Sequence, residues 1–394
     1  MTAKRRTHLS FVEIALIALI AVGGAFALHH GQKSAVLSAD PDPAPVSLTG
    51  RTVDSPAWDR ESLYRDLYDS LSAGGREVSF PYDCSDEIFD VFRQVLADHP
   101  ELFWLSGSGS LLKKTSGLAV TVDFRPEILV EDGEIETRAA ELEARAEEIL
   151  ARCAAGETLW DRLLLLHDIL VDETDYDSAA AEALGGDRQA DDFLNQSTSA
   201  YGCLVNRRAV CSGYAAAFQL LAERLGSECR RVQGTELMGG APHEWNVLRP
   251  EGSSGDWYQT DITWDDPLFS GEPLEGYRSY DYFCVTTEEI LRTHTIDDPE
   301  SVPLCTADAY NYYVRLGCVL DSYDFDALSS VVADQIENDC IYLKFPDEAA
   351  GEDAVSRLLK GQEIFDVPAV RELDVKTARG TSSDTGTVCI WLVR

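Results

Sequence analysis

The sequence is poor in basic residues, has no CxxC motif and has no apolar run long enough to span a membrane comfortably. Its 33 lysines and arginines stand against 69 acidic residues, which gives a formal net charge of −36. An acidic surface repels a phosphate backbone, which argues against nucleic acid as a partner. The ten cysteines are irregularly spaced and none forms CxxC, so we expect neither a structural metal ion nor a cofactor.

The N-terminus has the pattern of a targeting segment. Basic residues at positions 4–6 precede a mostly apolar stretch, of which Ile14 to Leu28 contains no charge. These 15 residues are fewer than the roughly 20 of a comfortable transmembrane helix. Cleavage after Ala27, at a small-x-small site, and retention as an anchor therefore both remain open. Either outcome places the rest of the chain outside the cytoplasm, secreted or anchored by this segment, because the cationic end stays inside.

Changes in composition and periodicity divide the chain into five segments. A stretch rich in Ser, Pro, Asp and Ala is typical of a tether, and helical spacing followed by alternating stretches predicts α+β structure on both sides of a central domain. The predicted segments are a signal peptide or anchor (1–28), a flexible tether (29–56), an N-terminal α+β region (57–130), a central domain (131–299) and a small C-terminal α+β appendage (300–394).

Local patterns predict individual elements within these segments. Apolar spacing and helix propensity predict helices, and alternation predicts strands. A polar, weakly periodic stretch over 172–200 is interpreted as a long connection. The expected helices cover 134–153, 159–171 and 347–359, and the expected strands cover 117–124, 340–345 and 387–393.

Cys211 stands at the predicted start of an amphipathic helix that ends near Gly226. The free N–H groups and positive dipole end of a helix start stabilise a thiolate and lower its pKa. The same N–H groups can receive the oxyanion of a tetrahedral intermediate. Taken alone, this cysteine is equally well explained as a buried structural residue.

His243 and Asp261 lie on two strand-like stretches separated by turn residues. Their midpoint, position 252, falls in the turn, so a hairpin folded there places the two residues opposite each other to within a register step or two. An aspartate facing a histidine can hold the imidazole tautomer and stabilise imidazolium. Together with a cysteine at a helix start, this pair predicts a cysteine–histidine–aspartate triad.

Three motifs resemble those of the transglutaminase-like superfamily of papain-like cysteine enzymes, in particular its secreted or membrane-anchored bacterial members. They are Cys-x-Gly-Tyr-Ala at 211–215, His-x-Trp-Asn at 243–246 and Trp-Tyr-x-x-Asp-x-Thr-Trp-Asp-Asp-Pro at 257–267. The resemblance extends over about residues 159–267. It implies that Cys211 is the nucleophile, His243 the general base and acid, and Asp261 the residue that orients the histidine.

The same resemblance implies an α+β fold with a papain-like core, in which a nucleophile helix packs on an antiparallel sheet. It implies cleavage of peptide or isopeptide bonds through a thioester on Cys211. Two alternatives remain open, a protein-crosslinking transglutaminase and a non-catalytic envelope scaffold or adhesin that keeps the fold. The expected partner is a protein or peptide, conceivably one of the cell envelope, and the oligomeric state is undetermined.

Other residues receive more modest interpretations. Tyr201 is a candidate for the oxyanion hole, and Trp245 and Trp264 are candidates for packing around the site or lining an acyl pocket. His167 is interpreted as structural. Cys203 occupies a position where the family more often has a small apolar residue, and we expect it to be buried rather than paired with Cys211.

Overall fold

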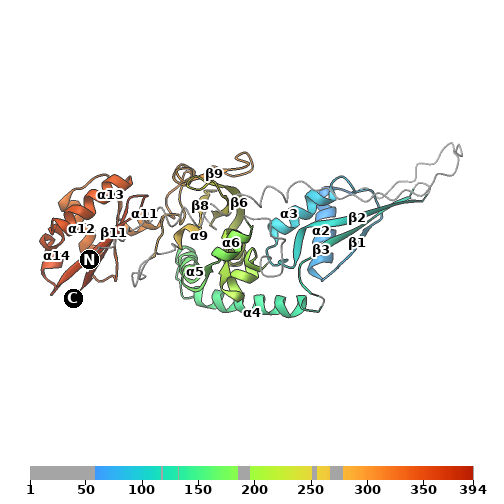
Figure 1. Cartoon of the computed structure of the whole chain (residues 1–394), viewed down its shortest axis with the longest axis horizontal. Coiled ribbons are helices and arrows are strands. Elements are labelled where there is room, and N and C mark those ends of the chain that lie inside the picture. The colour runs from blue at the N-terminus through green and yellow to red at the C-terminus, as the bar shows by residue number, and fades with distance from the viewer. Residues whose placement is uncertain are drawn as a thin grey trace, which may run out of the picture.

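The computed structural model describes residues 58–393 except 117–118, 132, 185–195, 251–254 and 267–277. The predicted targeting segment and tether lie outside the described residues. None of the described helices is long and apolar enough to cross a membrane. The described chain forms three groups of elements that follow one another along the long axis of the molecule (Figure 1).

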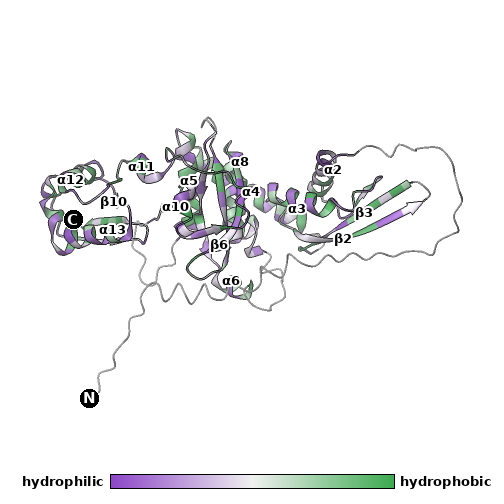
Figure 2. Ribbon diagram, turned by 90° about the horizontal axis from the view of Figure 1, so that it is seen from above, coloured by the Kyte–Doolittle hydropathy of each residue, from purple (hydrophilic) through white to green (hydrophobic). Residues whose placement is uncertain are grey.

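The N-terminal group places helices beside a three-stranded antiparallel sheet of order β1–β3–β2. Phe92 of α3 packs its ring edgewise against Phe124 of β3, which fixes the helix to the sheet. The β2–β3 hairpin extends away from α3 toward one end of the molecule (Figures 1 and 2). The elements are α2 (Arg60–Ser72), β1 (Val78–Phe80), α3 (Ile88–Asp98), β2 (Leu105–Ser116) and β3 (Ala119–Ile128).

The central group combines helices with a four-stranded antiparallel sheet of order β8–β7–β6–β9. Its first helices confirm the predictions at 134–153 and 159–171. The connection predicted over 172–200 contains a short helix. The elements are α4 (Ile135–Cys153), α5 (Leu159–Glu173), β4 (Asp175–Tyr176), α6 (Ser178–Leu184), η2 (Gly202–Asn206), β5 (Arg208–Ala209), α8 (Cys211–Arg224), β6 (Glu228–Glu236), β7 (Pro242–Arg249), β8 (Tyr258–Thr260), α9 (Ile262–Asp265), α10 (Thr287–Ile290) and β9 (His294–Ile296).

The C-terminal group is a three-stranded antiparallel sheet of order β10–β12–β11 with helices beside it. The predicted strands at 340–345 and 387–393 are confirmed as β10 and β12. The helix expected over 347–359 ends earlier and continues as a π-helical turn. The elements are α11 (Tyr312–Leu316), α12 (Phe325–Asp334), β10 (Ile341–Lys344), α13 (Glu348–Val355), η3 (Ser356–Lys360), η4 (Glu363–Asp366), α14 (Pro368–Arg371), β11 (Thr377–Ser382) and β12 (Thr387–Val393).

The hydrophobic core joins these groups rather than stopping at their boundaries. One cluster of buried residues runs from α2 and α3 through α5 and α8 to Tyr342 and Trp391 of the C-terminal sheet. Val388 and Ile390, which alternate with Trp391 along β12, belong instead to a second cluster that includes residues of α12 and α13. Because successive side chains of a strand point to opposite faces, this one sheet contributes residues to both clusters. The described chain is α+β, with antiparallel sheets and separate helices. The predicted domain boundaries stay predictions.

Candidate active site

Cys211 is the first residue of α8, as predicted from the sequence. Val210 before it has extended backbone and caps the helix without a side-chain hydrogen bond. The helix differs from the expected amphipathic one because every residue from Cys211 to Ala222 is buried. It lies between β6 and β7 on one side and α4 and α5 on the other, so apolar and small residues are needed all round. The thiol therefore belongs to a rigid, enclosed segment.

Gly213, in the turn that follows the cysteine, has a packing reason to be glycine. A Cβ at this position would lie 2.7 Å from the backbone oxygen of Ser197 and 2.8 Å from the Cβ of Ala209. The segment before the helix therefore approaches its first turn more closely than a side chain would allow. This close approach explains the glycine of the Cys-x-Gly motif and helps to fix the nucleophile.

His243 and Asp261 form a buried hydrogen-bonded pair. His243 Nε2 lies 2.6 Å from Asp261 Oδ2, and the two side chains are 7% and 1% exposed. The pairing of β7 with β8 aligns Asn246 with Thr260, so Asp261 stands two positions away from the residue directly opposite His243. This confirms the hairpin expectation of a register step or two. The predicted turn at 252 lies outside the described residues.

Asp261 is oriented by its place at the start of α9. Its Oδ1 atom accepts the backbone N–H groups of Thr263 and Trp264 at 3.0 and 3.2 Å, which makes it the N-cap of this short helix. Its own N–H donates to the carbonyl of Tyr282 at 3.0 Å. One carboxylate oxygen is thereby occupied by the backbone, and the other is directed at the imidazole of His243.

The charges around His243 favour its protonated form. Burial lowers the pKa of His243, but the charges of Asp261 and Cys211 and hydrogen bonds to both outweigh burial and hold that pKa well above its ordinary value. Burial alone would raise the pKa of Asp261. The charges of His243 and His294 and their hydrogen bonds to this carboxyl outweigh burial and lower the pKa, so Asp261 stays ionised. These directions favour an imidazolium–carboxylate pair of His243 and Asp261.

This arrangement assigns different tasks to the two ring nitrogens of His243. Nε2 is held by Asp261, so Nδ1 is the nitrogen that remains for proton exchange with the thiol of Cys211, which interacts with this ring. The triad residues predicted from separate motifs are thus brought together by α8, β7 and the start of α9. The geometry is suited to nucleophilic attack by sulfur with a histidine that gives and takes one proton.

The two tryptophans predicted around the site both pack near His243, but they differ in exposure. Trp245 stacks with His243 at 5.9 Å between ring centroids, is 1% exposed and donates its indole N–H to Gln259. Trp264 is partly buried and lies 6.1 Å from the same ring. Trp245 therefore backs the imidazole from inside. The role of Trp264 in lining an acyl pocket stays a prediction.

The structure does not favour Tyr201 as the oxyanion candidate and draws attention to Tyr176, for which the sequence suggested no role in the site. The hydroxyl of Tyr201 donates to Glu141 at 2.5 Å, which directs it away from a role as oxyanion donor. Tyr176 lies on β4 and pairs with Ala209, just before the nucleophile. Burial, together with the charges of Cys211 and Asp261, raises the pKa of Tyr176, so its hydroxyl keeps its proton. Tyr176 is thus a protonated hydroxyl within the electrostatic influence of Cys211.

His294 is a site residue that sequence reasoning missed. It lies on β9, is 1% exposed, and its Nε2 is 3.2 Å from Asp261 Oδ2. Its ring also contacts Trp264 at 4.6 Å between centroids. No local motif surrounds this histidine, and β9 joins the sheet beside β6 rather than beside a strand close in sequence. Only the tertiary structure reveals its place.

Three of these side chains converge closely enough to raise the question of a metal ion. Donor atoms of His243, Asp261 and His294 all lie within 4.8 Å of one another. Two ligands of a tetrahedral zinc ion are roughly 3.4 Å apart, given the usual bond lengths. The 2.6 Å between His243 Nε2 and Asp261 Oδ2 is instead the length of a hydrogen bond. A shared proton explains this contact without a metal.

His167, interpreted as structural, forms a second buried histidine–aspartate pair. Its Nε2 lies 3.2 Å from Asp265 Oδ2 and its Nδ1 lies 3.1 Å from Asp168. The rings of Tyr280 and Phe283 cover it at 5.0 and 5.1 Å. This pair joins α5 to α9 and so supports the base of the triad. The structural interpretation accounts for all of these contacts.

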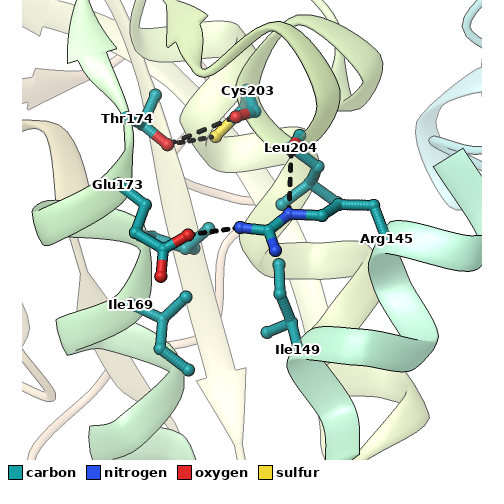
Figure 3. Close-up of a pocket in the computed structure, with 8 residues that line it drawn as sticks. Arg145, Ile149, Ile169, Glu173, Thr174, Cys203 and Leu204 are labelled. Atoms are coloured by element: carbon teal, nitrogen blue, oxygen red, sulfur yellow. Dashed lines mark hydrogen bonds and ion pairs between the residues drawn. The ribbon is translucent and has the colours of Figure 1, made fainter. Parts of the chain in front are cut away.

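A small pocket of about 160 Å³ lies between α4, α5 and η2 and does not include the triad (Figure 3). Arg145 extends into it, donating to the carbonyl of Leu204 and pairing with Glu173 (Figure 3). Cys203 is buried at its edge, 3.5 Å from the hydroxyl of Thr174. This space includes open solvent and leaves essentially no room even for a water molecule. The pocket is therefore better described as an ion-pair junction between helices.

The sequence matches no protein-family model, and no curated protein is significantly similar to it. Among solved structures, one described as the crystal structure of a TGase is similar over 51% of this chain, with 15% identity and a TM-score of 0.30. The match spans about half of that chain's length, 54%. A similarity this distant suggests at most a transglutaminase-like fold and carries no argument about function. The case for function rests on the residues of the site.

Proposed function

We propose that this protein is a cysteine enzyme that hydrolyses peptide or isopeptide amide bonds through a thioester on Cys211. The proposal is carried by one observation, the convergence of a helix-start thiol, His243 and Asp261. His243 interacts with the thiol and lies 2.6 Å from the carboxylate. A scaffold that merely kept the fold would have no need of this buried set of ionisable groups, which is costly to bury.

The first half-reaction uses the groups in a fixed order. The Cys211 sulfur attacks the substrate carbonyl carbon, and His243 gives its Nδ1 proton to the leaving amine as the carbon–nitrogen bond breaks. N–H groups at the start of α8 and the Tyr176 hydroxyl can receive the negative charge that develops on the carbonyl oxygen. Asp261 keeps its hydrogen bond to Nε2 throughout, which holds the ring in one tautomer.

The second half-reaction decides the type of enzyme. Water that enters with His243 as base releases a carboxylic acid, whereas an amine that enters in its place forms a new amide. Both acceptors use the same thioester, so the triad itself favours neither. Hydrolysis is our proposal because it needs no second substrate site, whereas amine transfer requires a further binding site for the amine.

We also propose that the enzyme acts outside the cytoplasm. The basis is the cationic N-terminus followed by an apolar stretch. Fractionation of cells with detection of the intact protein tests this directly. Recovery in a membrane or extracytoplasmic fraction is expected, and full-length protein in the cytosol would refute it. Intact mass of the mature protein separates cleavage after Ala27 from a retained anchor.

The activity is tested by incubating the full chain with a glutamine-containing peptide, with and without an amine donor, and measuring product masses. Hydrolysis predicts cleavage or deamidation that is independent of the amine, whereas transglutaminase activity predicts a product that carries the amine. The matched control is Cys211→Ala, in which every product should disappear. Products of equal yield from this variant would eliminate the proposed mechanism.

A further inference from the structure

Two histidines converge on one oxygen of Asp261. His243 Nε2 lies 2.6 Å from Asp261 Oδ2, and His294 Nε2 lies 3.2 Å from the same atom. His294 is buried and its Nε2 makes no well-directed hydrogen bond to any described residue, so Asp261 is the acceptor within reach. Its Nδ1 lies 2.8 Å from the hydroxyl of Thr293, which can donate to it. The same hydroxyl also lies 3.3 Å from the carbonyl of Ile290, a longer contact than the one to Nδ1. With Thr293 donating to Nδ1, the proton of a neutral His294 lies on Nε2, facing the carboxylate.

The surroundings of His294 keep its ring neutral. Burial lowers the pKa of His294 below its ordinary value; the nearby charge of His243 acts in the same direction, and the carboxylate of Asp261 acts against them. Across the strand pair stands Glu236, whose buried carboxylate is occupied by the N–H groups of Gly239 and Ala241. The remaining neighbours are the rings of Trp245, Trp264 and Tyr282. His294 therefore supplies a hydrogen-bond donor and no charge.

The need for this donor changes during the reaction. In the resting enzyme, the positive charge of His243 offsets the negative charge of Asp261. Once sulfur has formed its bond to the acyl carbon and the leaving group has taken the Nδ1 proton, the thioester and His243 are both neutral. Asp261 then remains as the buried negative charge of the site. An ionised group without a compensating charge depends most on the donors that surround it.

We propose that His294 is a positioning residue that keeps Asp261 ionised and directed at His243 while the thioester breaks down. This inference rests on the proposed function. In that step, water attacks the acyl carbon, His243 Nδ1 takes a proton from the water, and the carbon–sulfur bond breaks to return the thiolate. The base must have its proton on Nε2 and its lone pair on Nδ1. Without the His294 donor, Asp261 more readily takes a proton from solvent. A protonated Asp261 donates to Nε2, and the single ring proton of a neutral His243 then lies on Nδ1, which leaves no lone pair there to accept the proton of water.

The test separates formation of the thioester from its breakdown. The probe is p-nitrophenyl acetate, whose leaving group needs no proton, so the burst of nitrophenolate reports acylation and the later steady rate reports deacylation. His294→Phe keeps an aromatic ring among the tryptophans and removes the donor. His294→Gln restores an N–H group at the same distance along the side chain. Alkylation of Cys211 by iodoacetamide measures the thiolate independently.

In His294→Phe we expect the burst and alkylation rates to stay within about threefold of the wild type, while the steady rate falls about tenfold to a hundredfold, the size of a lost hydrogen bond to a charged group. His294→Gln should regain most of that steady rate. An unchanged steady rate in His294→Phe, with the wild type acetylated at Cys211, overturns this inference alone. So does an equal fall of burst, alkylation and steady rates that glutamine does not restore, because that is the signature of a structural role. Failure of the wild type to become acetylated at Cys211 overturns the proposed function and this inference together.

Discussion

The short helix α9 separates two buried histidine–aspartate pairs that look alike and differ in consequence. Asp261, before its first residue, pairs with His243, and Asp265, its last residue, pairs with His167. In the first pair, His243 interacts with the thiol of Cys211 at a helix start. The second is enclosed by the rings of Tyr280 and Phe283 and by hydrogen bonds from Ser279 and Tyr282. The chemistry expected of a buried histidine–aspartate pair therefore depends on the third group with which the histidine interacts, here the Cys211 thiol.

The largest expected effect is on the first pair. Asp261→Asn should keep the fold but lower the rate of thioester formation on the order of a thousandfold, because an amide cannot stabilise imidazolium and favours the wrong tautomer. Burst kinetics with p-nitrophenyl acetate measure this rate, and circular dichroism checks the fold. Asp265→Asn is the control at the other end of the same helix. A steep loss in this control with none in Asp261→Asn would reverse the assignment of the triad.

The second pair should affect stability more than chemistry. Asp265→Asn leaves a buried imidazolium with only Asp168 as a charged partner, which should reduce the free energy of unfolding by about 3 kcal/mol. Urea denaturation measures this loss, and the rate per folded molecule should stay within a few-fold of the wild type. A stable variant without activity would mean that this pair takes part in catalysis.

The same pair predicts a pH dependence of stability. Burial lowers the pKa of His167, but hydrogen bonds to Asp168 and Asp265 outweigh it and raise that pKa to about 9 from 6.5. Because the folded pKa lies above the unfolded one, the stabilisation is complete below pH 6.5 and is lost as the pH rises through 9. The shift corresponds to on the order of 3 kcal/mol. Urea titrations at several pH values should show this decline in the wild type and a much smaller one in His167→Asn.

The smallest expected effect concerns Asp266, which follows Asp265 of the second pair. Its replacement by asparagine should change the free energy of unfolding least. Burial raises the pKa of Asp266 to about 7, and its Oδ2 lies 2.6 Å from the Tyr214 hydroxyl, which is also 2.8 Å from the Thr174 carbonyl. A protonated Asp266 can donate to the tyrosine oxygen while the tyrosine donates to Thr174. Asparagine can make the same donation, so Asp266→Asn should change the free energy of unfolding by less than about 1 kcal/mol. A larger change in urea denaturation would show that the ionised form is required.

The sequence was sufficient to predict the parts of the site that have local signatures. Cys211 is predictable because it stands at the start of an apolar helical run that ends near Gly226, and His243 and Asp261 are predictable because one hairpin carries both. The extent of burial of α8 was not predictable, since small residues on all faces look like a weak amphipathic helix until the sheet and helices around it are known. His294 lies on a strand that joins the sheet beyond β6, and such long-range pairing leaves no periodic signal.

The C-terminal group shows the same limit. Strands β10 and β12 were predicted because they are rich in β-branched and aromatic residues, which are typical of buried strands. The sequence of β11 (Thr377–Ser382) is polar and contains glycine, and it was missed because an edge strand needs only one paired side. Local composition therefore identified the central strand β12 and the apolar edge strand β10, and missed the polar edge strand β11.

The central claim, that Cys211 is a nucleophile activated by His243, is tested most directly by limiting iodoacetamide under reducing conditions near neutral pH, followed by peptide mapping. All ten cysteines are free and buried, and burial raises the pKa of others such as Cys84 and Cys203 to about 12. The account predicts preferential labelling of Cys211 in the wild type and loss of this preference in His243→Ala. Preferential labelling of another cysteine, or a preference for Cys211 that His243→Ala leaves unchanged, would contradict it.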